Sequence, residues 1–210
     1  MSSMKSPIIT GFLLFLLMLP AGAVMVDDFN DGEFKKIPEW WTFDKVTATV
    51  TKNPAKSGYA LMIKGAARDW YVGGLGTYIA KDKQDLSKAS TLDLDIYGFG
   101  PDSGTLKIEL YDDDNGNWQI EQDNKTFNPI YDDRFAYELK IDWKGWKHIS
   151  LPLAEFVDTN NGAGDNVWNP QQTGSSGGLL QMQIISIAAS KTGKVNYVLD
   201  NVEFREGKRK

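Results

Sequence analysis

The sequence predicts an all-β fold, a sandwich or a barrel of short antiparallel strands. Glycine, asparagine and aspartate turn signals recur along the chain, and the short runs between them are rich in β-branched and aromatic residues. No segment carries a long helical period. Two runs, 92–97 and 106–111, alternate strictly between apolar and polar or aromatic residues. Such alternation indicates strands with one face in a core and the other face outside it.

The expected strands follow one another without a clear internal repeat or a long linker. A single turn of helix is expected at 154–157. In the run 70–79, Gly73, Gly74 and Gly76 indicate a bulge or a close backbone approach, because no helix follows them as a phosphate-binding loop requires. The strands are expected at 41–51, 59–64, 70–79, 92–97, 106–111, 118–122, 135–142, 146–151, 180–188 and 196–204.

Residues 1–23 have the pattern of a secretory signal peptide. Lys5 precedes the apolar run 8–19, and Pro20 precedes the small residues 21–23. We expect cleavage after Ala23, a mature domain at 24–206 and a short basic tail at 207–210. The protein is then secreted, periplasmic or on the cell surface, with no membrane span after signal removal. An uncleaved membrane anchor is the alternative.

The composition restricts the chemistry of the chain. Its 210 residues include no cysteine and carry a net charge of −5. Thiolate catalysis and cysteine metal sites are therefore excluded, and nucleic acid is not an expected partner of an acidic chain. The single histidine, His148, provides neither a serine triad nor a histidine zinc site. Within the loop 158–170, the beginning of a calcium-loop spacing is followed by Asn169 where an acid is expected.

The outer faces of the two alternating runs carry the candidate binding groups. One face presents Asp93, Asp95 and Tyr97, and the other presents Lys107, Glu109 and Tyr111. Aromatic rings with carboxylates and amines are typical of sugar binding, but ordinary solvated faces are the alternative. A carboxylate pair drawn from Asp93, Asp95 and Glu109 leaves a hydrolase or lyase open.

Six motifs in order resemble galactose-binding-like jelly rolls, in particular carbohydrate-binding modules of family 11 and the related domain of complex I intermediate-associated proteins. Together they cover nearly all of residues 26–204. The opening motif is Val-Asp-Asp-Phe-Asn-Asp-Gly at 26–32, and the closing motif is Asn-Tyr-Val-Leu-Asp-Asn-Val-Glu-Phe at 196–204. The other motifs lie at 57–64, 70–79, 85–97 and 146–156.

The resemblance implies a two-sheet antiparallel β-sandwich, a jelly roll, that binds a β-glucan-like polysaccharide or glycoconjugate and has no catalytic residues. If the strands 92–97 and 106–111 belong to opposite sheets, only one of their polar faces lines the groove. A structural or protein-interaction domain of the cell envelope, with a protein partner, is the alternative on the same fold. The implied aromatic platform is Tyr97, Tyr111 and Trp118, and the implied hydroxyl partners are Asp93, Asp95, Glu109 and Gln183, with Arg134 as a further candidate.

The resemblance also implies a structural calcium ion between the first and last strands. Its expected ligands are the carboxylates of Asp28, Asp31 and Asp200, with backbone carbonyls near 56–58. The alternative is that Asp200 simply ends a strand.

Overall fold

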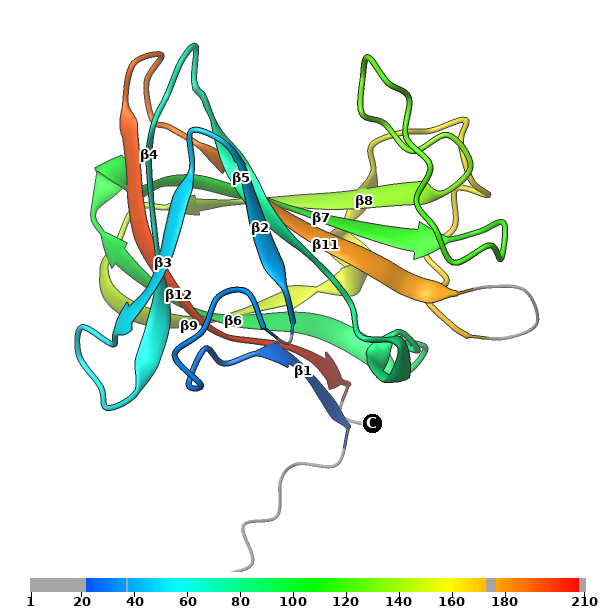
Figure 1. The fold of residues 1–210 in the computed structure, drawn as a ribbon, viewed down its shortest axis with the longest axis horizontal. Helices are drawn as coiled ribbons and strands as arrows, with labels where there is room; N and C mark the ends of the chain where they lie inside the picture. The colour runs from blue at the N-terminus through cyan, green and yellow to red at the C-terminus, as the bar shows by residue number, and fades with distance from the viewer. Residues whose placement is uncertain (1–21, 37, 173–176, 208–210) are drawn as a thin grey trace, which may run out of the picture.

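The computed structural model describes residues 22–36, 38–172 and 177–207, and these form two antiparallel sheets packed face to face (Figure 1). The β6 sheet has the order β3 (Thr47–Lys52), β4 (Tyr59–Ala66), β12 (Lys194–Glu206), β6 (Ala89–Phe99) and β9 (Lys144–Pro152), and β1 (Ala23–Asp27) also pairs with β12. The β7 sheet has the order β10 (Val157–Asp158), β8 (Asp133–Ile141), β7 (Gly104–Asp113), β11 (Gly178–Ile187), β5 (Tyr71–Tyr78) and β2 (Trp40–Asp44). The predicted two-sheet β-sandwich is confirmed.

The core lies between the sheets, where the alternating residues point. Leu92, Leu94 and Ile96 of β6 are fully buried, and the equivalent leucines and isoleucine of β7 are fully buried against them. The period of two therefore predicted the buried face of both strands correctly. The polar residues of the two strands lie on opposite outer surfaces of the sandwich, because β6 and β7 belong to different sheets.

The expected strand at 41–51 is two strands in different sheets. Asp44 has φ of 55°, which ends β2, and the Lys45 N–H then donates to the Val72 carbonyl at 3.0 Å. The chain turns this corner and enters the β6 sheet as β3. A left-handed aspartate is common at such corners, but its position is not visible in a run of apolar and polar residues.

The expected strand at 118–122 is wrong. The Asp113 carboxylate accepts hydrogen bonds from the N–H groups of Gly116 and Trp118, at 2.8 and 2.9 Å, and Trp118 has φ of 64°. The aspartate thereby closes a turn that removes these groups from any strand ladder. Residues 114–132 form the loop between β7 and β8 instead.

Short 3₁₀ turns complete the secondary structure, as η1 (Lys81–Lys83), η2 (Pro101–Ser103) and η3 (Leu153–Glu155). The last of these provides the helical turn expected near 154–157. Among the residues that the structure describes, no helix is long and apolar enough to span a membrane.

The first and last strands lie side by side, as the jelly-roll resemblance implies. Val24 pairs with Phe204, and Asp27 pairs with Val202 (Figure 1). The expected signal peptide lies outside the described residues apart from Gly22 and Ala23, the second of which begins β1. Of the expected basic tail, only Gly207 lies within the described residues.

Candidate functional site

A groove of about 700 Å³ lies on the outer face of the β7 sheet. Its floor is formed by side chains from β2, β5, β7, β8 and β11, and the loop between β7 and β8 forms one wall. Several strands of a rigid sheet thus position the floor, while a single loop borders it. We call this cavity the β7 groove.

The centre of the β7 groove is a polar cluster around Glu109. This carboxylate is 5% exposed. Its Oε1 lies 2.7 Å from Lys107 Nζ and 3.9 Å from Arg134 Nε, and its Oε2 accepts a hydrogen bond from the Tyr111 hydroxyl at 2.8 Å. Thr159 fixes the guanidinium, because Arg134 Nε donates to Thr159 Oγ1 at 2.9 Å and Nη2 donates to the Thr159 carbonyl at 3.2 Å. The cluster therefore holds donors and acceptors in fixed positions at the floor.

Tyr111, which donates to Glu109 in this cluster, is buried, with 2% of its surface exposed. Burial, and then the charge and hydrogen bond of Glu109, raise the pKa of the Tyr111 phenol above its ordinary value. The hydroxyl therefore stays protonated and donates to the carboxylate at any physiological pH. Tyr111 orients Glu109 and does not offer an open ring for stacking.

The open aromatic rings come from β2 and lie across the glycines of β5. A Cβ at Gly76 would lie 2.6 Å from Cζ2 of Trp41, and a Cβ at Gly74 would collide with the ring of Phe43. The two rings can cover this strand only because glycines face them. This is the close approach that the glycine-rich run predicted, with side chains as the approaching groups.

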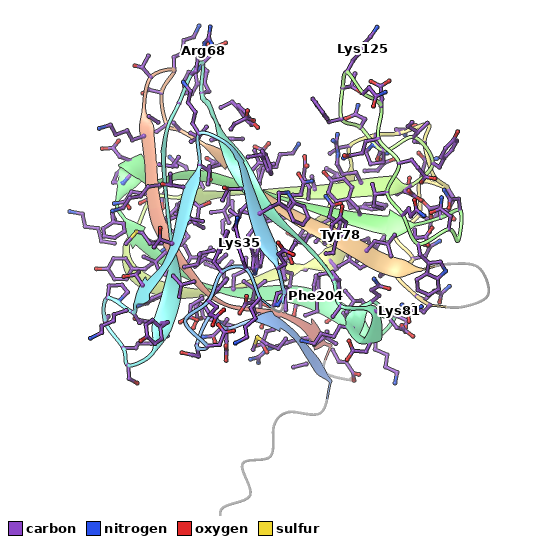
Figure 2. All side chains as sticks on the ribbon, viewed as in Figure 1. Lys35, Arg68, Tyr78, Lys81, Lys125 and Phe204 are labelled. Carbon is purple, nitrogen blue, oxygen red and sulfur yellow. The ribbon has the colours of Figure 1, made fainter. Side chains whose placement is uncertain are left out.

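A second ring extends this platform. The Trp41 and Tyr78 ring centroids lie 4.9 Å apart, and Tyr78 is 63% exposed. Figure 2 labels Tyr78, which lies at the end of β5. Tyr71 also lines the groove, and its hydroxyl donates to Asp44 Oδ2 at 2.6 Å. Burial, the hydrogen bond to Asp44 and its charge raise the pKa of Tyr71 above its ordinary value.

Strand register aligns the platform with the polar cluster. Trp41, Gly76, Gln183 and Glu109 are successive cross-strand partners on β2, β5, β11 and β7. Cross-strand partners point to the same face of a sheet, so Gln183 stands between the tryptophan ring and the carboxylate. The groove face consequently has rings at the β2 edge and hydrogen-bonding groups at its centre.

The wall of the β7 groove is the tip of the loop 114–132. The Ile130 N–H donates to the Glu121 carbonyl at 2.9 Å, and Gln122 Nε2 donates to the Phe127 carbonyl at 2.9 Å. Phe127 is 68% exposed and lines the groove. Figure 2 shows Lys125 at the tip of this loop, which projects away from the sheet.

The structure divides the residues that the sequence singled out between two faces. Glu109, Tyr111, Gln183 and Arg134 lie together in the β7 groove. Asp93, Asp95 and Tyr97 belong to β6, on the outer face of the other sheet. Trp118 lies in the loop after β7, 43% exposed, with Lys81 Nζ 4.9 Å from its ring centroid.

The two β6 aspartates are engaged by neighbouring side chains. Asp93 accepts from Ser150 Oγ at 2.7 Å, and its other oxygen lies 3.2 Å from Arg205 Nε and 3.3 Å from His148 Nε2. Asp95 lies 3.0 Å from His148 Nδ1 and 3.2 Å from Lys56 Nζ. His148 thus lies between both carboxylates in a surface network of polar and charged side chains.

Tyr97 belongs to an aromatic cluster next to this network. Its ring centroid lies 5.0 Å from that of Phe99 and 5.6 Å from that of Trp146, with edge-on geometry. Lys56 covers the Trp146 ring, with Nζ 4.9 Å from its centroid. These rings pack on one another on the β6 sheet, whereas Trp41 packs on Tyr78 and lies against Gly76 on the β7 sheet.

Three rings on the groove face of the β7 sheet were not predicted from the sequence: Phe43 lines the groove, and Trp41 and Tyr78 lie on the same face of the sheet. A signal for them was present, because Trp41 and Phe43 are spaced by two and so are Gly74 and Gly76. When aromatic residues on one strand and glycines on its partner have the same spacing, each ring can lie over the backbone of the opposite glycine. Which two strands pair cannot be read from one sequence.

The expected calcium ligands lie where the first and last strands meet. Asp200 is 5% exposed, and its Oδ2 accepts from Asn53 Nδ2 at 3.1 Å. Burial raises the pKa of Asp200 to about 6, with the charge of Asp28 among the causes. Asp28 and Asp31 each accept a backbone N–H within the turn after β1. Asp200 is thus buried, Asp28 is half-buried, and the charge of Asp28 opposes ionisation of Asp200.

Comparison with known proteins was made by sequence and by structure. No family model and no curated protein matches the sequence. A family 11 carbohydrate-binding module from Clostridium thermocellum, solved with a β-1,3-1,4-mixed-linked tetrasaccharide, matches the structure with a TM-score of 0.56 and 16% identity, over 89% of this chain and 96% of that chain. The protein has the fold of a family 11 carbohydrate-binding module. The resemblance seen in the sequence is thereby confirmed for the fold.

Two further solved structures are similar to this chain in fold. An exo-β-agarase matches with a TM-score of 0.56 and 12% identity, over 89% of this chain and 26% of that chain. The CBM22-1 xylan-binding domain of Paenibacillus barcinonensis Xyn10C matches with a TM-score of 0.50 and 12% identity, over 90% of this chain and 98% of that chain.

Proposed function

We propose that the protein is an exported, non-catalytic carbohydrate-binding module that holds a β-glucan-like polysaccharide in the β7 groove. The observation that carries the proposal is the alignment of the Trp41 ring, Gln183 and Glu109 across one sheet face. A flat ring beside fixed hydrogen-bonding groups suits a pyranose, which has apolar C–H faces and polar hydroxyl edges.

The groove divides the binding between two kinds of contact. Trp41 and Tyr78, on the same sheet face as the groove, would stack on sugar rings at the β2 edge. Glu109, Arg134 and Gln183 would bond hydroxyls within the groove. An open groove buries few ligand atoms, so dissociation constants on the order of micromolar to millimolar are expected for oligosaccharides.

The fold neighbours support a polysaccharide as the ligand. The family 11 module was solved with a mixed-linked β-glucan tetrasaccharide, and the CBM22-1 neighbour is described as a xylan-binding domain. The mixed-linkage β-glucan is therefore the first probe to test, with xylan as the second.

The positions of the acids predicted from the sequence support a non-catalytic role. Asp95 and Glu109 lie on different sheets, with outward-pointing side chains. Packed sheets lie about 10 Å apart, so these carboxylates are too distant for the roughly 5–9.5 Å separation of a glycosidase pair. Asp93 and Asp95 share a face, but His148 and further donors engage both of them.

The decisive experiment is calorimetric titration of the purified protein with the mixed-linkage tetrasaccharide. Trp41→Ala should weaken binding by about 2 kcal/mol or more, roughly thirtyfold, as truncation of a binding hot spot does. Trp146→Ala is the matched control, because Trp146 is also half-buried on an edge strand but on the β6 sheet. It should leave the affinity unchanged.

The other outcomes identify the alternatives. A loss caused by Trp146→Ala alone would move the ligand to the β6 face. No binding to any glycan, together with recovery of a protein partner, would favour an interaction domain. New reducing ends that disappear in Glu109→Gln would favour a hydrolase.

We also propose that a structural calcium ion joins the first and last strands at Asp28 and Asp200. Chelation should then lower the melting temperature, and Asp200→Ala should reduce this dependence. At a calcium concentration of a hundred times Kd, the stabilisation is about 2.7 kcal/mol. Identical melting curves with calcium and with chelator would remove the ion from this place.

A further inference from the structure

A second group of acids lies at the ends of β7 and β8, away from the first and last strands. One carboxylate oxygen from each of Asp112, Asp114 and Asp133 lies within 4.8 Å of the other two. Asp112 and Asp133 are direct cross-strand partners, and both are fully buried. Like charges opposite one another on paired strands are destabilising, so this arrangement calls for a compensating charge.

Each of the three carboxylates accepts a hydrogen bond from a backbone N–H group. Asp112 Oδ2 accepts from the Asn169 N–H at 3.2 Å, Asp114 Oδ2 from the Asp133 N–H at 2.9 Å, and Asp133 Oδ2 from the Val167 N–H at 3.1 Å. These bonds leave the second oxygen of each side chain for another partner.

The second oxygens have no hydrogen-bond donor. Oδ1 of Asp112, of Asp114 and of Asp133 are all buried and unpaired, and the same holds for Oδ1 of Asn169. The ion pairs found among the described residues include none of these three acids. Leaving a buried carboxylate oxygen unpaired is costly, and three together are explained by a cation that binds all of them.

The surroundings enclose the cluster closely. Gly164 has φ of 62°, and a side chain there would collide with the carboxylates of Asp114 and Asp133. Burial, then the charges of Asp114 and Asp133, raise the pKa of Asp112 to about 8. The backbone of Gly164 lies close to the carboxylates, and the negative charge is concentrated there. Both features agree with a small cation as the occupant.

We infer that Asp112, Asp114 and Asp133 form a calcium-binding site that joins the ends of β7 and β8 to the loop 158–169. Oxygens that all lie within 4.8 Å of one another can bind one Ca²⁺ ion, whose ligands lie about 2.4 Å from the ion. Carboxylate and carbonyl oxygens are its preferred ligands, and the amide oxygen of Asn169 lies next to the three acids. Magnesium demands near-ideal octahedral geometry and gives up its waters reluctantly, so it suits an enclosed set of protein oxygens less well.

The test uses the purified protein in an Asp200→Asn background, which removes the ion proposed between the first and last strands. After treatment with EDTA and dialysis, calorimetric titration with calcium chloride should show one bound ion and a rise in melting temperature. Asp114→Asn should weaken this binding at least about tenfold, because it removes a charged ligand. Asp142→Asn is the control, an exposed aspartate just beyond the opposite end of β8.

Stability in EDTA gives an independent readout. Asp114→Asn should melt at the same temperature as the Asp142→Asn control or higher, because it relieves repulsion and its amide can still accept the Asp133 N–H. A lower melting temperature would show that Asp114 is structural without an ion. Absence of calcium binding, calcium binding unchanged by Asp114→Asn, or equal stabilisation by magnesium would overturn the inference.

Discussion

Replacing Gly76 with alanine tests how the sheet presents its tryptophan. The added methyl would lie 2.6 Å from Cζ2 of Trp41, whereas carbon atoms in contact prefer about 3.5–4.0 Å. The indole must therefore move by about 1 Å. Trp41 is on edge strand β2, so the ring can lift away from the sheet.

Two opposing contributions set the stability of Gly76→Ala. Overpacking costs about 1–3 kcal/mol, and alanine restricts the unfolded chain by about 0.4–1 kcal/mol in the opposite direction. With an outward path for the ring, we expect a net loss of about 1 kcal/mol in urea unfolding.

The effect of Gly76→Ala on sugar binding follows from the ring displacement. A gap of up to 1 Å forfeits about a quarter to a half of a contact, and a full aromatic hot spot is worth about 2 kcal/mol. The expected loss is therefore about 0.5–1 kcal/mol, or roughly two- to fivefold in affinity. Calorimetry with the mixed-linkage tetrasaccharide measures it, and near-ultraviolet circular dichroism reports the ring environment.

A double-mutant cycle with Trp41→Ala separates this explanation from a general distortion of β5. Once the indole is absent, Gly76→Ala should have no further effect on affinity. Additive losses, or an unchanged affinity and tryptophan signal in Gly76→Ala alone, would refute the reasoning.

Three further predictions concern the core, the β6 face and the N-terminus. Leu94→Ala should cost about 2–5 kcal/mol in urea unfolding through a buried cavity, while the folded fraction keeps its sugar affinity; a smaller loss would contradict its core position. Burial opposes ionisation of Asp95, but hydrogen bonds from Asn201, His148 and Lys56 hold the pKa of Asp95 below its ordinary value. The ionised carboxylate therefore stabilises the fold above about pH 3.9, and this stabilisation is lost as the pH falls through the pKa of the folded state. Asp95→Asn should accordingly be less stable than the wild type at neutral pH and equal to it in strong acid, and a pH-independent difference would exclude this linkage. Mass spectrometry of exported protein should show a mature chain that starts at Val24 or within a few residues, whereas retention of Met1 would indicate an uncleaved anchor.

Much of the fold could be predicted because alternation reports burial directly. The core faces of β6 and β7 follow from leucines and isoleucines spaced by two. The corner at Asp44 and the turn closed by Asp113 could not be predicted, because a left-handed residue and a side-chain hydrogen bond decide them. Both interrupt runs that otherwise read as strands.

The candidate site was predicted only in part, because sheet membership is not encoded in alternation. Glu109 and Gln183 meet in the β7 groove since β7 pairs with β11, whereas Asp95 and Tyr97 belong to the other sheet. The β2 rings were missed because their position depends on glycines of a separate strand. The alternation within a strand predicts which of its residues face the core, but the residues beside them on the sheet depend on which strands pair.

Amide chemical-shift mapping during titration with the mixed-linkage tetrasaccharide tests the central claim most directly. The account predicts that the shifted amides concentrate on β2, β5, β7 and β11, with Gly74, Gly76 and Gln183 among them. Amides of β6 and β9, including those of Asp95 and Trp146, should stay in place. Shifts confined to β6 and β9, or no shifts at saturating sugar, would contradict carbohydrate binding in the β7 groove.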